Sequence, residues 1–264
     1  MIMVDLNSDL GESFGAYTLG ADGEVLPHIT SANIACGFHA GDPLTMEQTV
    51  LSAAALGVAV GAHPGYPDLM GFGRRSMTCS AGEIKAYIQY QLGALMAFAA
   101  AHGVKVQHCK PHGALYNAAA RNAELAKAIA QGIAEVDRDI ILLGLAGSEL
   151  VKAGQQIGLS TACEVFADRA YRADGSLMPR SQPDSVIQNP EEIVGRAIQM
   201  VTEGIVTAAT GEKVAVEAHS ICVHGDTPSA ANLVQKIHSA LEKAGVRVAP
   251  LVQALDKGER LCLR

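Results

Sequence analysis

Six short polar clusters stand where apolar, β-branched runs of this sequence end, usually beside Gly or Pro. They contain the carboxylates, amides, imidazoles and cations that acid–base chemistry or metal binding needs. In chain order they are Asp5/Asn7/Asp9, Asn33/His39/Asp42, His63/Asp68, Lys110/His112/Asn117, Glu164/Asp168/Arg169 and His224/Asp226. Most are followed by a segment with helical periodicity. Strands that end in polar groups and lead into helices are typical of parallel α/β enzymes, whose functional groups gather at the carboxyl ends of the strands.

One acid and two imidazoles in these clusters could bind a divalent metal, because Asp with two His is a common ligand set. The residues concerned are Asp9, His63 and His112. Pro64 and Pro111 stiffen the backbone beside the two imidazoles, which helps to fix a ligand or a general base. Turn formation is the alternative explanation for the first cluster, since Asp and Asn readily cap turns.

Several imidazoles and one carboxylate in these clusters are candidates for proton transfer. His39 and His224 lie in Gly-flanked turns, where the backbone can approach a ligand closely. Together with His112 and Glu164 they could serve as the general base or the proton donor, and Asp226 joins them as a catalytic candidate. Three other histidines are expected at the surface: His28, His102 and His238.

Lys110 follows directly after an apolar strand, where it could supply a fixed cation for a carboxylate, a phosphate or a developing oxyanion. A lysine whose stem covers apolar surface at a barrel rim is the alternative. Arg169 is the strongest candidate for an anion clamp, ahead of Arg172 and Arg180. We also expect three amides to bind substrate: Asn7, Asn33 and Asn117.

About seven strand–helix units must position these groups. Strands are predicted at 2–6, 32–36, 58–62, 104–109, 140–145, 160–166 and 220–223, with a short extended piece at 246–249. Helices are predicted from 43 to about 56, from 81 to about 102, within 115–136, from about 148 to 156, from 190 to about 208 and at 228–244. Asp42 with Pro43 and the pair Ser80/Glu83 are clear helix-start signals. The pattern favours one closed or nearly closed β/α barrel over residues 1–264, with an open doubly wound sheet as the alternative.

The segment 167–188 is too long and too rich in Gly and Pro for an ordinary connection, and such loops are usually lids or binding loops. No G-x-x-x-x-G-K-[ST], G-x-G-x-x-G or H-E-x-x-H motif occurs in the sequence. If ATP is used, the sequence does not show where it binds.

Composition narrows the class of protein. Hydrophobic residues make up 49% of the 264 residues, charged residues 18%, and the net charge is −7 without any Lys/Arg run. A globular protein that binds neither nucleic acid nor anionic membranes is therefore expected. The N-terminus lacks the basic region of a signal peptide, and no apolar run is long enough to span a membrane. Six widely spaced cysteines without C-x-x-C indicate reduced thiols in a cytoplasmic protein.

Six motifs together resemble the LamB/YcsF family over essentially the whole chain. They are DLNSDLGE (5–12), NIACGFHAGD (33–42), GAHPGYPD (61–68), KPHGALYN (110–117), EVFADR (164–169) and CVHGD (222–226). The resemblance implies the A subunit of an ATP-dependent 5-oxoprolinase, which opens 5-oxo-L-proline (pyroglutamate) to L-glutamate with ATP, Mg²⁺ and two partner subunits, B and C. It also implies a seven-stranded parallel β/α barrel resembling the polysaccharide deacetylases, with Asp9, His63 and His112 as the matching metal ligands.

Three hypotheses about function follow. The sequence does not decide whether the chain forms a homo-oligomer. The first is a lactam-opening component of a larger enzyme. Five-membered lactams reclose readily because the amine and the carboxyl group are held together, so coupling to phosphoryl transfer would favour opening. The second is a self-sufficient metal-dependent deacetylase or amidohydrolase. The third is a non-catalytic barrel that carries or regulates a partner enzyme.

Overall fold

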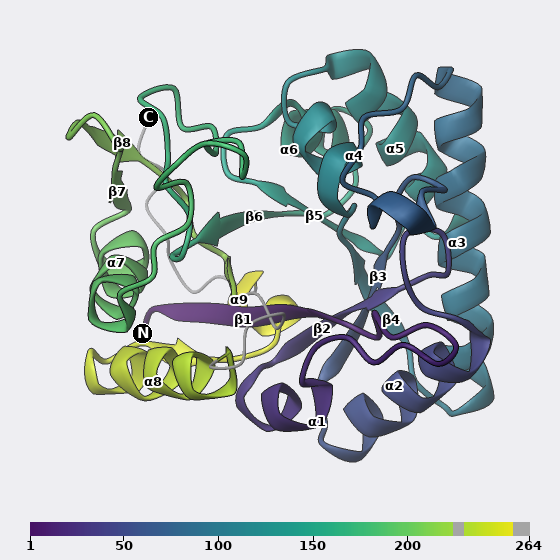
Figure 1. Ribbon diagram of the computed structural model, residues 1–264, viewed down its shortest axis with the longest axis horizontal. Coiled ribbons are helices and arrows are strands. Elements are labelled where there is room, and N and C mark those ends of the chain that lie inside the picture. Colours follow the sequence, from purple (N-terminus) through teal and green to yellow (C-terminus); the bar gives the residue numbers. More distant parts are fainter. Residues whose placement is uncertain (224–229, 256–264) are drawn as a thin grey trace.

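The computed structural model describes residues 1–223 and 230–255, and its centre is a closed parallel barrel (Figure 1). The barrel strands are β1 (Met3–Leu10), β2 (Ser31–Ala35), β3 (Ala59–His63), β4 (Val106–Cys109), β5 (Ile141–Leu145), β6 (Thr161–Phe166) and β9 (Ser220–Cys222). Each pairs with the next in this order, and β9 pairs with both β6 and β1, so the ring closes. Short β10 (Arg247–Val248) pairs with the start of β1. The predicted seven-stranded barrel is confirmed, and the open-sheet alternative is wrong.

Helices cover the outside of the barrel (Figure 1). They are α2 (Pro43–Ala55), α3 (Ala81–Ala101), α4 (Gly113–Ala119), α5 (Ala123–Val136), α6 (Glu149–Gln156), α7 (Pro190–Thr202) and α8 (Ala230–Lys243). Shorter elements are α1 (Asp22–Val25), η1 (Leu26–His28), η2 (Leu69–Gly71) and α9 (Leu251–Leu255). Within the described residues, no helix combines the length and apolar character needed to cross a membrane.

The two strongest helix-start signals work as predicted. Asp42 caps α2, its carboxylate accepting from the Thr45 N–H at 2.9 Å, with Pro43 in the first turn. Ser80 and Glu83 form a reciprocal capping box at the start of α3. These caps satisfy backbone donors that a helix otherwise leaves unpaired at its N-terminus.

Two boundaries differ from the prediction. Strand β1 continues to Leu10 instead of ending at Leu6, because the polar residues that follow face a polar barrel interior rather than a turn. Helix α7 ends at Thr202 instead of reaching about Ala208. Gly204, with φ of +67°, then turns the chain into an antiparallel hairpin of β7 (Ile205–Thr207) and β8 (Lys213–Ala215). Only glycine adopts this left-handed conformation without strain.

The segment 167–188 contains no helix or strand along its fully described length, as expected for a binding loop. Two isolated bridges fold it back on itself, joining Arg169 to Val186 and Tyr171 to Leu177. Arg169 and Leu177 also line the pocket described below, so this loop forms part of the pocket wall.

The barrel interior is apolar at one end and polar along β1. Ile141, Leu143 and Ala162 pack against Leu251 of α9 at the apolar end. On β1, the buried carboxyl group of Asp5 accepts hydrogen bonds from three hydroxyl groups, those of Thr30, Ser31 and Ser220. Burial nevertheless raises the pKa of Asp5 to about 6.

The cysteines agree with the expected reduced state. None of the five described cysteines forms a disulfide, and Cys36, Cys109 and Cys222 are buried. Cys262 lies outside the described residues. Buried thiols of this kind act as small apolar groups in the core.

Candidate active site

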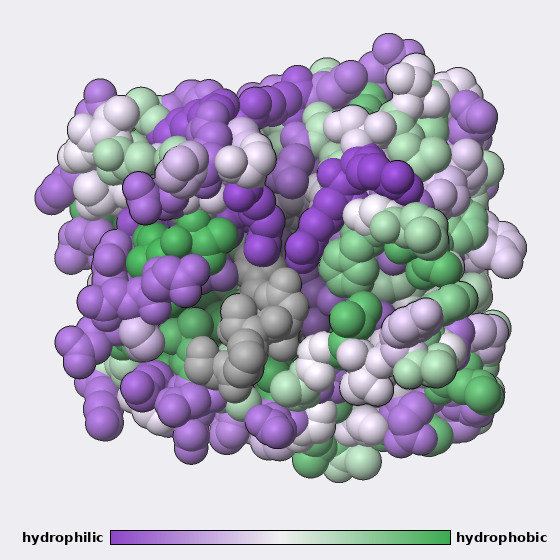
Figure 2. Space-filling view, in the orientation of Figure 1, coloured by the Kyte–Doolittle hydropathy of each residue, from purple (hydrophilic) through white to green (hydrophobic). Residues whose placement is uncertain are grey.

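A pocket opens at the carboxyl ends of the barrel strands. Its ionisable lining residues are Asp9, Glu12, His63, Arg74, Lys110, His112, Tyr116, Arg169 and Arg180. Figure 2 shows that the centre of this face is hollowed, with hydrophilic residues on both sides. Polar clusters from β1, β3, β4 and β6 therefore meet at one end of the barrel, as the sequence predicts.

Lys110 lies buried between two carboxylates. Its ammonium nitrogen is 2.9 Å from Oδ1 of Asp9 and 2.9 Å from Oε1 of Glu164. Burial alone would lower the pKa of Lys110, but the negative charges around it, with Asp9 foremost, raise this pKa well above its usual value. The ammonium group is therefore a fixed cation at the pocket floor.

His63 and His112 face each other through ring nitrogens that both carry lone pairs. Nδ1 of His63 lies 2.7 Å from the carbonyl oxygen of Lys110, and Nε2 of His112 lies 2.9 Å from that of Phe72. A carbonyl oxygen only accepts, so each of these two nitrogens carries a proton. The other two nitrogens, Nε2 of His63 and Nδ1 of His112, are 2.9 Å apart. Two lone pairs at this distance repel unless a proton or a metal ion lies between them.

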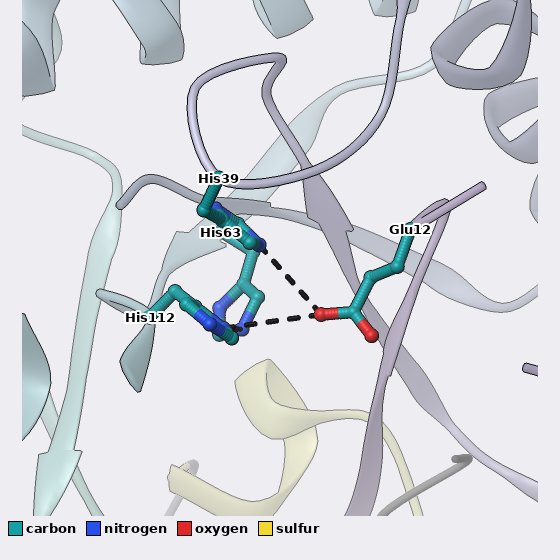
Figure 3. Close-up of side chains that lie close together, drawn as sticks. All are labelled: Glu12, His39, His63 and His112. Carbon is teal, nitrogen blue, oxygen red and sulfur yellow. Dashed lines mark hydrogen bonds and ion pairs between the residues drawn. The ribbon is translucent and has the colours of Figure 1, made fainter. Parts of the chain in front are cut away.

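His39 and Glu12 complete this cluster (Figure 3). The His39 ring stacks on His112 with centroids 3.7 Å apart, and its Nε2 is 3.6 Å from Oε1 of Glu12. The same Glu12 oxygen is 3.8 Å from Nδ1 of His112. Glycines at 65 and 73 allow this packing, since a Cβ at either would lie 2.7 Å from an atom of His39.

Burial keeps the imidazoles of His39 and His112 neutral. It lowers the pKa of His112 to about 3, and His63 adds to the effect. Burial likewise lowers the pKa of His39 well below its usual value, with His112 as the next cause. Among the described residues, neither ring nitrogen of His39 has a hydrogen-bond partner. Neutral rings with available lone pairs are the protonation state that metal binding requires.

The ligand atoms of Glu12, His39, His63 and His112 all lie within 4.8 Å of one another, so the barrel holds a group able to bind a metal. One carboxylate with three imidazoles suits Zn²⁺ and similar divalent ions. The sequence paired His63 and His112 with Asp9. In the structure Asp9 approaches His63 at 3.3 Å but also binds Lys110, and it stands outside the four-residue group.

Several predicted residues lie one layer beneath the pocket. Glu164, Asn7 and Asn33 are fully buried and are not among the pocket-lining residues. Glu164 accepts from the Tyr116 hydroxyl at 2.6 Å and from the Asn7 amide at 3.0 Å. Burial, reinforced by Glu164, raises the pKa of Tyr116 well above its usual value, so its hydroxyl remains a donor. Glu164, Asn7 and Asn33 hold Lys110 and Asp9 from below, whereas Tyr116 is one of the pocket-lining residues.

Sequence reasoning missed Tyr116 and His108. Both lie inside regular elements, where no Gly or Pro distinguishes them from core residues. His108, on β4, is fully buried, and burial lowers its pKa to about 3, with the charge of Lys110 as the next cause. Its Nε2 donates to Oδ1 of Asn33 at 2.7 Å.

Cationic and amide groups line the pocket wall. The Arg169 guanidinium is held by backbone carbonyls, at 2.6 Å from Met178 and 3.3 Å from Ser185. Arg74, Arg180 and Asn117 line the same pocket, whereas Arg172 is not among its lining residues. Three guanidinium groups around one pocket favour an anionic ligand.

The remaining candidate residues and histidines fall into two groups. His224 and Asp226 lie outside the described residues. The three histidines expected at the surface, His28, His102 and His238, are not among the pocket-lining residues.

Comparison with known proteins gives consistent matches along the chain. The LamB/YcsF family pattern matches residues 4–256. A relative from Alkaliphilus metalliredigens, named as the A subunit of 5-oxoprolinase, is 56% identical over 94% of this chain and 97% of its own. The crystal structure of a lactam utilization protein from Thermus thermophilus is 48% identical, with a TM-score of 0.89 over 94% of this chain and 99% of that one. A T48 deacetylase structure is more distant, at 16% identity and a TM-score of 0.48 over 96% of this chain and 90% of that one.

Proposed function

The chain belongs to the LamB/YcsF family, and on that premise we propose that it is the A subunit of a 5-oxoprolinase, which opens the lactam of 5-oxo-L-proline to give L-glutamate. Water adds to the ring carbonyl carbon, the C–N bond breaks, and the freed amine takes a proton. The observation that carries the proposal is the placement of Lys110, held between Asp9 and Glu164, on the floor of a pocket walled by arginines.

Three parts of the reaction have a matching group in the pocket. The Lys110 ammonium would stabilise the negative charge that develops on the lactam oxygen or on a phosphoryl group attached to it. Arg169, with Arg74 and Arg180 nearby, would bind the substrate carboxylate. Asp9 lines the pocket and is the carboxylate best placed to accept a proton from water. Glu164 is fully buried below Lys110, so we assign it the role of a counterion.

A divalent metal fits the residues of this site. Glu12, His39, His63 and His112 would hold it, because their donor atoms converge and the two facing nitrogens of His63 and His112 need a cation between them. When bound, such an ion would polarise a carbonyl group or lower the pKa of bound water.

We further propose that ring opening uses ATP with Mg²⁺ and partner subunits B and C in the cytoplasm. The relatives' name, which designates one lettered component, supports a multi-subunit enzyme. Neither G-x-x-x-x-G-K-[ST] nor G-x-G-x-x-G occurs in this sequence, which favours ATP binding on a partner. The chain would then act on a lactam activated by phosphoryl transfer.

The test is to mix the chain with subunits B and C, ATP, Mg²⁺ and 5-oxoproline and to measure glutamate. Omission of this chain should abolish glutamate formation. Glutamate formation at the full rate without it would overturn the proposal.

The same preparation addresses the two other hypotheses. Amidase or deacetylase activity of the isolated chain with a bound metal, without ATP or partners, would favour a self-sufficient hydrolase. Full activity of the complex with Lys110→Ala, His112→Ala or Glu164→Ala would favour a non-catalytic barrel.

A further inference from the structure

One row of side chains crosses four neighbouring strands below the pocket. The strand register places Asp9 of β1 beside Asn33 of β2, Asn33 beside Gly61 of β3, and Gly61 beside His108 of β4. The imidazole of His108 reaches across the glycine and donates from Nε2 to Oδ1 of Asn33 at 2.7 Å. A hydrogen bond thus spans a whole intervening strand.

Gly61 is required for this contact by space rather than by backbone conformation. A Cβ built on Gly61 would lie 2.1 Å from Nε2 of His108 and 2.2 Å from Cε1. No side chain other than hydrogen leaves room for the ring in this position. The glycine on β3 and the histidine on β4 therefore form one structural unit.

The acceptors and donors around Asn33 fix the orientation of its amide. Its Nδ2 donates to Oδ1 of Asp9 at 2.8 Å and to Oδ1 of Asn7 at 2.7 Å. Asp9 bonds to the Lys110 ammonium and is an acceptor, so the amide nitrogen must point toward Asp9 and the amide oxygen toward His108. His108 is the donor that holds this orientation.

Hydrogen bonds also fix the orientation of the Asn7 amide. Its Nδ2 donates to Glu164 at 3.0 Å and to the Ser220 hydroxyl at 2.7 Å, and its oxygen lies 3.3 Å from Nζ of Lys110. Two amides thus orient both carboxylates that flank Lys110. A change at the far end of the row would let Asp9 and Lys110 move.

We propose that His108, seated on Gly61, is a positioning residue for ring opening: it locks the Asn33 amide and thereby places Asp9 and the Lys110 ammonium. This inference rests on the proposed function of the pocket. His108 is buried and is not among the pocket-lining residues, so it acts through Asn33 rather than on the substrate.

The test compares His108→Gln with His108→Asn in the complex with subunits B and C. The Gln amide nitrogen stands as many bonds from Cα as Nε2 of His108, so it can keep the donor, whereas the Asn nitrogen is one bond short. We expect His108→Asn to lower kcat for glutamate formation on the order of 10²-fold with KM little changed, since small misplacement of reacting groups has effects of this size. His108→Gln should stay within about tenfold of the wild type. Equal kcat values for the two variants would overturn the inference.

A second variant keeps the test decisive if His108→Asn folds poorly. Gly61→Ala should displace the ring and lower kcat in the same way. Because both substitutions break the same contact, adding Gly61→Ala to His108→Asn should lower kcat little further. Independent, multiplicative losses would contradict a shared unit.

A measurement that does not depend on enzyme activity tests this inference separately from the proposed function. In ¹⁵N-histidine NMR of the full chain, the His108 signal, identified by its loss in His108→Gln, should show a neutral ring protonated at Nε2. A ring protonated at Nδ1 would overturn the inference, whatever the complex catalyses. Glutamate formation that does not need the chain would instead remove the proposed function alone.

Discussion

Nε2 of His63 and Nδ1 of His112 lie 2.9 Å apart, and the carbonyl groups of Lys110 and Phe72 orient both rings so that these nitrogens carry lone pairs. Burial opposes protonation of His112, whose pKa falls to about 3. A cation shared with Glu12 relieves the repulsion between the lone pairs. The fold therefore holds these side chains together as a site for a metal ion.

The metal-free chain should bind one Zn²⁺ per molecule, and His112→Ala should weaken the affinity by about 100-fold or more, since even groups behind the ligands change affinity about 10–100-fold. Isothermal titration calorimetry measures this. His102→Ala is the matched control, because His102 pairs with Glu47 outside the pocket lining and should leave the affinity unchanged. Identical Zn²⁺ affinities of His112→Ala and the wild type would contradict the site.

Removing the Lys110 charge should destabilise the fold. Lys110→Met leaves the carboxylates of Asp9 and Glu164 without their cation, and loss of one partner from a buried ion pair costs about 3–5 kcal/mol. Urea unfolding gives the free energy of unfolding. Lys152→Met is the control, since its exposed pair with Glu149 contributes at most about 1 kcal/mol. A loss for Lys110→Met no larger than that of the control would rule out a tightly coupled triad.

The free energy of unfolding should fall with rising pH because of the deprotonation of Asp5. Burial raises the folded-state pKa of Asp5 from 3.8 to about 6, so the folded protein binds this proton more tightly than the unfolded chain. The resulting stabilisation is complete below pH 3.8 and disappears as the pH rises through 6, a difference of about 3 kcal/mol. The difference in free energy of unfolding between wild type and Asp5→Asn, measured by urea from pH 4 to 8, should change by most of this amount. A pH-independent difference would show that Asp5 does not titrate in this range.

Arg169→Lys should raise KM for 5-oxoproline more than it lowers kcat. The guanidinium would bind the substrate carboxylate equally in the ground and transition states, and loss of such binding appears in KM. An increase of about tenfold or more is expected, because a lysine lacks the planar fork of donors. Arg138→Lys, on the surface bonded to the Ile157 carbonyl, is the control. A changed kcat with an unchanged KM would place Arg169 in a different role.

Most of the barrel could be predicted from the sequence, because apolar runs, caps and polar strand ends are local signals. Asp42 and Ser80 marked two helix starts correctly. The end of α7 could not be predicted in this way. Ile205 and Val206 extend the apolar pattern of the helix, and only pairing with β8 makes them a strand.

The sequence predicted several residues of the site but not the contacts between them. The position of Lys110, His63 and His112 after apolar runs predicted that they meet at one end of the barrel. It could not show that Glu12 rather than Asp9 completes the imidazole group, because the two acids lie three residues apart at the end of β1. His108 was missed because its partner lies two strands away across Gly61, a relationship set by register alone.

We propose above that the lactam opens at the Lys110 end of this barrel. The most direct measurement is the rate of glutamate formation by the complex with subunits B and C when the chain carries Lys110→Met, with Lys152→Met in parallel and folding of each verified by circular dichroism. We expect a loss on the order of 10²–10³-fold for a folded Lys110→Met chain and wild-type rates for Lys152→Met. Wild-type glutamate formation by a folded Lys110→Met chain would contradict the proposal.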